Sequence, residues 1–419
     1  MSQAIKNMNI NGDRLWQSLM AMAKIGPGVA GGNNRQALTD EDGQARHLFQ
    51  DWCQDAGLTM TTDTMGNMFA RREGTDPDAL PIMVGSHLDT QPTGGKYDGV
   101  LGVLAGLEII RSLNDLDIKT KHPIEVVNWT NEEGCRFSPP MLSSGVFAGV
   151  YDAEWAYDRT DANGYRFGSE IERIGWIGDE KVGDHPLKAY LELHIEQGPI
   201  LEDEDVPIGI VTHGQGLVWT KITLVGQESH AGSTPMDRRV NAGLGMARII
   251  ASVDDIAQRY APNARATVGQ CDVYPNAVNV IPGQAILTVD MRDPDQDQLN
   301  AMVNNLYEHA NKIADEIGLE IQFEELSNMS PIAFDDDVIN HLKEASASLG
   351  YRSKDLVSGA GHDAFWVSKI APSAMIMCPC VGGLSHNEAE EITPEWATAS
   401  TDVLYHAVLN MAEISTHDE

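Results

Sequence analysis

Short apolar runs alternate with amphipathic stretches through the first half of the chain. Three of the apolar runs, at residues 82–85, 124–129 and 190–193, have the length and composition of buried strands. Apolar positions that recur at three- and four-residue spacing predict a helix over residues 99–112. This alternation is typical of βαβ units, so we expect an α/β main domain around a central, mostly parallel sheet.

The pattern changes from about Gly216. The residues that follow predict, in order, strand 219–225, helix 241–260, strand 266–273, strand 285–292, helix 297–317 and strand 320–326. A β-α-β-β-α-β order is that of a ferredoxin-like domain. Helix 337–349, an apolar strand at 372–377 and helix 394–412 follow. We therefore predict a discontinuous main domain, residues 1–215 and 332–419, with a ferredoxin-like domain inserted at 216–331.

The overall charge narrows the choice of partners. The chain has 29 Lys and Arg against 62 Asp and Glu, a formal charge of -33. Long-range repulsion then opposes binding to nucleic acid or to an anionic membrane. The first residues contain no apolar leader and no long apolar stretch occurs elsewhere, so we expect a cytoplasmic protein.

Five scattered cysteines favour reduced thiols over a disulfide framework. Cys378 and Cys380 alone form a pattern that a soft metal ion could use. They follow an apolar run and lack a second cysteine pair, so the sequence favours a buried strand end over a ligand pair.

Five polar loops, each containing His, Asp or Glu, lie next to predicted strands. In open α/β sheets such loops meet at the carboxyl edge, where ligands bind. A single His beside a strand is more often a satisfied core or rim residue, but five such loops in one chain favour a common site. The candidate ligands in these loops are His87, Asp98, Glu133, His194 and His386.

Three imidazoles with carboxylates suit Zn²⁺, Mn²⁺, Co²⁺ or Ni²⁺, and five ligands exceed the need of one tetrahedral ion. We therefore predict two ions bridged by Asp98, roughly 3.5–4 Å apart, which together could lower the pKa of a shared water. Adjacent side chains leaving an extended strand point in opposite directions. We accordingly assign Glu133 to a metal ion and Glu132 to general base catalysis.

The sequence around these residues resembles a family of dinuclear metallohydrolases. The family contains the aminoacylase and carboxypeptidase G2-like peptidases, and the resemblance is to its hydantoinase/carbamoylase amidases. It covers nearly the whole chain and is carried by residues 85–92, 94–99, 131–137, 194–198 and 385–388. The peptidases typically have a carboxylate where this chain has His194, which favours the amidase branch. Asp89 resembles the carboxylate that orients a ligand imidazole.

The resemblance also implies roles for the inserted domain, as a lid and as the contact of a homodimer. His230 would stabilise the oxyanion formed at the attacked carbonyl, in its own or the neighbouring subunit's site. Asn279 and Arg292 would hold the substrate carboxylate. Gln197 and Gly361 match further substrate contacts.

Plainer interpretations compete with some of these roles. Arg292 could form a structural ion pair with Asp290 or Asp293, and His230 could be a cap or turn residue. His362 and Asp363 stand in a glycine-rich turn that leads into a predicted helix at 363–367, so we leave them out of the ligand set.

The resemblance implies hydrolysis of an N-carbamoyl-L-amino acid to the amino acid, carbon dioxide and ammonia. β-Ureidopropionate and allantoate are alternative substrates, because both contain a ureido group and a carboxylate. An aminoacylase or dipeptidase on the same scaffold is a further alternative. His194 argues against it, because the peptidases typically have a carboxylate at this position. A non-catalytic protein that binds amino acids through the metal centre would not need Glu132.

Overall fold

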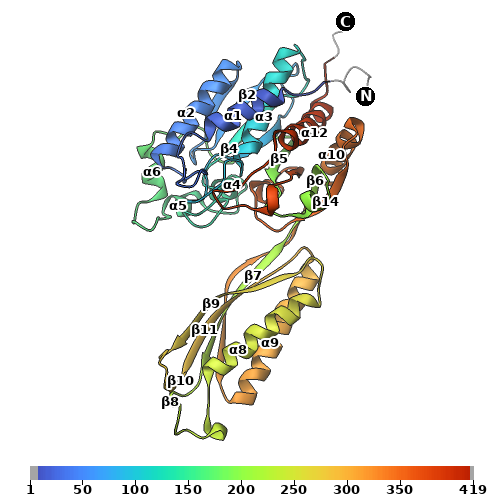
Figure 1. Ribbon diagram of the computed structural model, residues 1–419. Helices are drawn as coiled ribbons and strands as arrows, with labels where there is room; N and C mark the ends of the chain where they lie inside the picture. The colour runs from blue at the N-terminus through green and yellow to red at the C-terminus, as the bar shows by residue number, and fades with distance from the viewer. Residues whose placement is uncertain (1–7, 416–419) are drawn as a thin grey trace. The chain divides into compact units, whose positions relative to one another are not determined.

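The computed structural model describes residues 8–415 of the chain. These residues divide into two compact units, each built around its own sheet (Figure 1). Unit 1 runs to Thr212 and resumes at Phe334, and unit 2 spans His213–Ala333. The boundaries expected from the sequence, at 215/216 and 331/332, fall close to these points. The expectation drawn from the first residues concerns residues 1–7, which lie outside the described residues.

Unit 1 is organised by a sheet that has nine strands in the described part of the chain. They are β1 (Thr59–Thr62), β2 (Met68–Arg72), β3 (Ile82–His87), β4 (Ile124–Trp129), β5 (Ala189–Ile195), β6 (Ile208–Gly214), β13 (Ile332–Ala333), β14 (Ser353–Ser358) and β15 (Ser373–Cys378). Their order is β1-β2-β4-β3-β5-β15-β6-β13, and β14 pairs with β6. The pairing of β6 with β13 joins residues 213–214 to 332–333 and so falls within unit 2.

The four central strands, β4, β3, β5 and β15, run parallel and are buried along their whole length. A parallel strand covered on both faces explains why these segments are continuous apolar runs in the sequence. The predicted α/β class and parallel centre are confirmed. Antiparallel strands on both edges, such as β2 beside β4 and β6 beside β15, were not predicted.

Helices cover this sheet. Those of unit 1 are α1 (Gly12–Met22), α2 (Asp40–Asp55), α3 (Val100–Asp115), α4 (Leu142–Phe147), α5 (Ala153–Tyr157), α6 (Phe167–Arg173), α7 (Ile200–Asp203), α10 (Asp336–Leu349), α11 (Asp363–Val367) and α12 (Pro394–Ala412), with a 3₁₀ turn η3 (Val381–Gly383). α3 packs on β3, β4 and β5, and α12 packs on β15 and α10. The hydroxyl of Thr393 caps α12 by accepting from the backbone N–H of Trp396.

Unit 2 has the predicted strand-helix-strand-strand-helix-strand order. Its elements are β7 (Gly216–Val225), β8 (Ser229–His230), η2 (Met236–Arg238), α8 (Ala242–Gln258), β9 (Arg265–Tyr274), β10 (Val280–Ile281), β11 (Gln284–Asp293), α9 (Gln296–Ile317) and β12 (Glu320–Met329). The antiparallel sheet has the order β12-β7-β11-β9, and α8 and α9 pack side by side against it (Figure 1). The short pair β8-β10, which the sequence did not predict, stands apart from this sheet.

Two further expectations concern the whole chain. Within residues 8–415, none of the helices combines the length and apolar character that crossing a membrane requires. Cys378 and Cys380 are free thiols buried at the end of β15, as expected of a strand end.

Candidate metal centre

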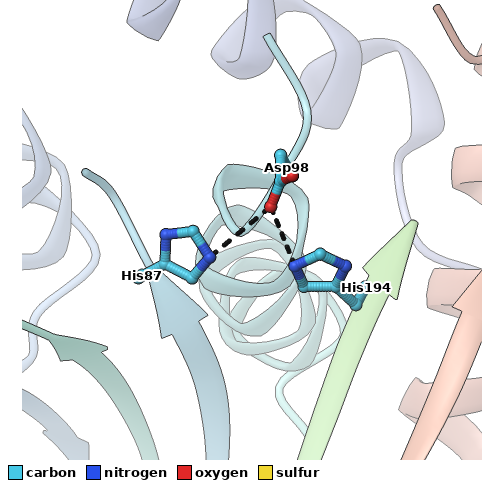
Figure 2. Close-up of side chains that lie close together, drawn as sticks. All are labelled: His87, Asp98 and His194. Carbon is cyan, nitrogen blue, oxygen red and sulfur yellow. Dashed lines mark ion pairs between the residues drawn. The ribbon is translucent and has the colours of Figure 1, made fainter. Parts of the chain in front are cut away.

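Two histidines face each other at the carboxyl ends of neighbouring parallel strands. His87 is the last residue of β3, and His194 lies near the end of β5. Figure 2 shows both rings directed toward Asp98, which precedes α3. Asp98 Oδ1 is 3.6 Å from His87 Nε2 and 3.0 Å from His194 Nε2. Gly99 has φ +67°, and a Cβ there would overlap the His87 ring, so only glycine allows this close approach.

Backbone carbonyl groups orient both imidazole rings. His87 Nδ1 lies 2.9 Å from the carbonyl oxygen of Asp89, and His194 Nδ1 lies 3.0 Å from that of Ile195. A carbonyl oxygen can only accept, so each Nδ1 donates and each neutral ring directs its Nε2 lone pair toward Asp98. His87 Nε2 is buried without a hydrogen-bond partner. Lone pairs that face a carboxylate need a cation between them, and a divalent metal ion fits this arrangement.

A second group forms on the other oxygen of Asp98. His386 Nε2 is 3.6 Å from Asp98 Oδ2 and 3.5 Å from Glu133 Oε2. Gln91 holds the Glu133 carboxylate, because its backbone N–H and side-chain Nε2 donate to it at 3.1 and 2.6 Å. The five candidate ligands thus form two groups of three that share Asp98, and within each group the ligand atoms lie within 4.8 Å of one another.

The adjacent residues Glu132 and Glu133 face different groups. Glu132 Oε2 is 3.4 Å from His87 Nε2, whereas Glu133 lies beside His386. The backbone N–H groups of both donate to the Asp89 carboxylate, at 3.2 and 3.3 Å. Asp89 therefore orients His87 through its carbonyl oxygen. Its carboxylate, expected to contact that ring, is 3.8 Å away, because the single Nδ1 proton goes to the nearer carbonyl.

The electrostatics of the cluster reflect this crowding. Burial opposes a charged His87, but Glu132 and the neighbouring carboxylates outweigh it and raise the pKa of His87 well above its ordinary value. Burial would also raise the pKa of Asp98, yet His194 and His87 hold that pKa well below its ordinary value. Burial raises the pKa values of Glu132 and Glu133 well above the ordinary range. Protons then occupy positions that a metal ion would take, and metal binding would release them.

Two predicted substrate contacts also belong to unit 1. Gln197 Nε2 donates to Asp98 Oδ2 at 2.9 Å and to Ser385 Oγ at 3.1 Å, so Gln197 touches the bridging candidate directly. Its Oε1 is buried without a hydrogen-bond partner. Gly361 stands where a Cβ would lie 2.7 Å from Met141 Cε, so glycine keeps this position open.

The other predicted contacts belong to unit 2. His230 is exposed in β8, and its Nδ1 accepts from the backbone N–H groups of Gly232 and Ser233 at 3.0 and 3.1 Å. A neutral His230 therefore carries its proton on Nε2, which makes that atom a donor. The carbonyl of Asn279 accepts from the N–H of Ala231 at 2.9 Å, which places Asn279 beside His230. Arg292 forms an ion pair with Asp290 at 2.8 Å, one of the partners considered above.

The sequence reasoning missed Glu390, and it considered His362 and Asp363 only as possible ligands. Glu390 Oε1 accepts from the backbone N–H groups of Tyr97 and Asp98 at 3.1 and 3.2 Å, and burial raises the pKa of Glu390 to about 8. His362 and Asp363 do lead into α11, but both are buried. The His362 ring centroid lies 4.4 Å from that of His194. Residue spacing carried no signal for the contacts of Glu390, because its partners lie far away in the sequence. Neither His362 nor Asp363 belongs to the two groups of ligand atoms.

Comparison with known proteins shows the family. The model of Peptidase family M20/M25/M40 matches residues 83–410. The chain belongs to this family. The N-carbamoyl-L-amino-acid amidohydrolase of Rhizobium meliloti is 60% identical over 409 residues, 98% of each chain.

Two further members extend the match. The N-carbamoyl-L-amino acid amidohydrolase of Geobacillus stearothermophilus is 38% identical over 408 residues, 96% of this chain and 99% of the relative. A crystal structure of an amidase of the hydantoinase/carbamoylase family from Burkholderia multivorans is similar with a TM-score of 0.93 and 52% identity, and covers 97% of this chain and 98% of its own. The resemblance to the amidase branch of the family is confirmed.

Proposed function

We propose that the protein is a metal-dependent amidohydrolase that converts N-carbamoyl-L-amino acids to the free amino acid, carbon dioxide and ammonia. The observation that carries this proposal is the pair of three-residue groups that share Asp98, with Glu132 beside the first of them. Relatives named for this activity match nearly the whole chain, which supports the substrate class.

The donor atoms suit two divalent ions. His87 and His194 would hold one, Glu133 and His386 the other, and Asp98 would bridge them. When bound, such ions polarise a carbonyl group and lower the pKa of a water molecule between them. Mixed imidazole and carboxylate ligands accept Zn²⁺, Mn²⁺, Co²⁺ or Ni²⁺, and the supply of each ion decides which is used.

The protein's own side chains would move the proton and bind the substrate. Glu132 takes a proton from the attacking water and passes it to the leaving nitrogen. His230 donates from Nε2 to the oxygen that gains charge. Arg292 and Asn279 bind the substrate carboxylate, and Gln197 and Gly361 complete the contacts.

His230 and Arg292 lie at opposite ends of unit 2. Two subunits are therefore needed if both residues contact one substrate molecule. Arg292 pairs with Leu217 near the start of β7, whereas His230 pairs with Val280, ahead of the start of β11. At about 3.3 Å per residue, the part of β11 from residue 284 to Arg292 alone spans roughly 25 Å. A small ureido acid is too short to contact His230 and Arg292 of the same unit 2 at once. We therefore propose a homodimer in which unit 2 of one subunit supplies His230 and Asn279 to the other subunit's site.

Ammonia release from a substrate panel tests the activity. Protein that is stripped of metal and refilled with Mn²⁺, Zn²⁺ or Co²⁺ should release ammonia from N-carbamoyl-L-amino acids. The panel should also contain the D enantiomers, β-ureidopropionate, allantoate, N-acetyl amino acids and dipeptides. Release from β-ureidopropionate or allantoate alone would move the assignment to those substrates, and release from no ureido acid would overturn it. A cytoplasmic location stays a prediction from the sequence.

A further inference from the structure

A glycine-rich loop near the start of the chain binds the carboxylate of Glu388. Glu388 Oε1 accepts from the backbone N–H of Val29 at 3.2 Å, and Oε2 accepts from the N–H groups of Ala30 and of Gly32, the latter at 3.2 Å. Backbone N–H groups that converge in this way form an anion-binding nest. Backbone N–H groups of Val29, Ala30 and Gly32 therefore hold the Glu388 carboxylate in this nest.

The nest depends on the absence of side chains. A Cβ on Gly28 would overlap the Glu388 carboxylate, and a Cβ on Gly32 would lie 2.6 Å from Glu388 Cα. Asn33 fixes the base of the loop, because its Nδ2 donates to the carbonyl groups of Ala23, Ile25 and Gly26 at 3.0, 3.2 and 3.0 Å. Residues 28–32 thus form a fixed receptor for one carboxylate.

His386, two residues before Glu388, needs such an anchor more than the other histidine ligands. Its side chain is 52% exposed, against 1% for His87 and His194. Its φ is +51°, in the left-handed region that residues other than glycine adopt uncommonly. His87 and His194 are held by strands, whereas His386 lies in the turn between η3 and α12.

We propose that Glu388 is a positioning residue that ties the turn carrying His386 to residues 28–32 and so keeps His386 Nε2 facing Asp98 and Glu133. Its own carboxylate is bound by the nest, so Glu388 acts through His386. This inference rests on the proposed function, because it concerns the second of the two metal groups.

Metal titration of four proteins tests the inference. Metal-free wild type, Glu388→Gln, Gly28→Ala and Glu391→Gln are titrated with Mn²⁺ by calorimetry, with elemental analysis of the dialysed proteins. Gly28→Ala should push the carboxylate out of the nest without altering any candidate ligand. Glu391→Gln is the control, since it removes the same charge from an exposed residue of the same segment. In both nest variants the second ion should bind about 10- to 100-fold more weakly while the first binds normally.

The outcomes separate this inference from the proposed function. Two ions bound with wild-type affinity by Glu388→Gln and Gly28→Ala would overturn the inference alone. Equal weakening of both ions would also overturn it, because a positioning role at His386 affects one group. If the wild type itself binds fewer than two ions, the two-metal function fails, and that failure is visible before any variant is compared.

Discussion

Glu132 and Glu133 show how two adjacent carboxylates acquire different duties. Both backbone N–H groups are held by the Asp89 carboxylate, yet one side chain faces His87 and the other faces His386. Gln91 donates two hydrogen bonds to Glu133. Glu133 is therefore fixed as a ligand should be, while Glu132 stands beside the first group.

Substituting these two residues in turn separates the duties. Glu132→Gln should keep two metal ions per subunit while turnover falls by roughly 10²- to 10⁴-fold, because the amide cannot accept the proton of the attacking water. Glu133→Gln should lose the ion of the second group, because a charged ligand is removed. Elemental analysis and ammonia release measure the two effects. Near wild-type turnover in Glu132→Gln would refute its role as the base.

The sequence could predict the candidate ligands because they stand at the ends of buried strands or in the segments that follow them, where topology alone brings loops together. His87 and His194 lie at or near the ends of β3 and β5, and the other three ligands lie after β3, β4 and β15. Residues that act through the backbone could not be predicted in this way. Glu390 binds the N–H of Asp98, 292 residues away, and Glu388 binds that of Val29, 359 residues away. A backbone N–H group has no residue type, so neither pairing leaves a pattern in the sequence.

Among the elements, β4 and α12 agree with the predicted ranges at both ends, because their apolar runs begin and end sharply. β3 and β5 are buried just as completely but extend beyond the predicted 82–85 and 190–193, because polar residues such as Ser86 and His194 still lie within the strands. The short helices α4, α5 and α6 and the edge strands β1 and β14 were not predicted. Each of these helices has at most seven residues, about two turns, and the strands are short and only partly buried, so a hydrophobic period cannot be recognised in them.

A histidine between two strands should make the stability of unit 1 depend on pH. The His185 ring stacks on the ring of Phe69 in β2, with 4.3 Å between the ring centroids. Its Nε2 lies 2.7 Å from the buried Glu125 carboxylate of β4. Burial opposes a charged ring, but Glu125 and then Glu180 raise the pKa of His185 above 6.5. Protonated His185 therefore stabilises the fold fully below about pH 6.5, its value in the unfolded chain, and this contribution disappears as pH rises through the folded pKa. Arg71, which also pairs with Glu125, keeps its charge throughout.

Thermal melting of metal-free protein checks this expectation. The midpoint of His185→Gln should lie furthest below that of the wild type near pH 6, and the difference should shrink toward pH 9. His309→Gln, on α9 in the other unit, serves as a control for the loss of an imidazole. A difference that does not change with pH would show that His185 contributes only through packing.

At the scale of the whole molecule, a charge of -33 on each copy opposes association. Unit 2 offers features that could overcome it. Its strand β9 is largely exposed and lies at the edge of the sheet, where backbone groups can pair with another chain. Exposed apolar side chains of unit 2 are Trp219, Met236, Leu244, Tyr274, Val278 and Leu326. These features support the proposed homodimer.

Complementation between two inactive variants tests whether subunits share a site. His230→Ala and Glu132→Gln should each have little activity alone. If His230 acts in the partner's site, a mixed dimer has one complete site, and random exchange of equal amounts should restore about a quarter of wild-type activity. Absence of recovery, with subunit exchange verified by mass spectrometry, would place His230 in the site of its own chain.

The place of unit 2 in the chain has a consequence for synthesis. His87, Asp98, Glu133 and His194 all precede it, and His386 follows it. As the chain leaves the ribosome, its N-terminal parts are available first. All three ligands of the first group are then present while the second group still lacks its histidine. We expect a chain that stops within or soon after unit 2 to retain at most one metal ion. Only a chain translated through His386 would then bind both ions.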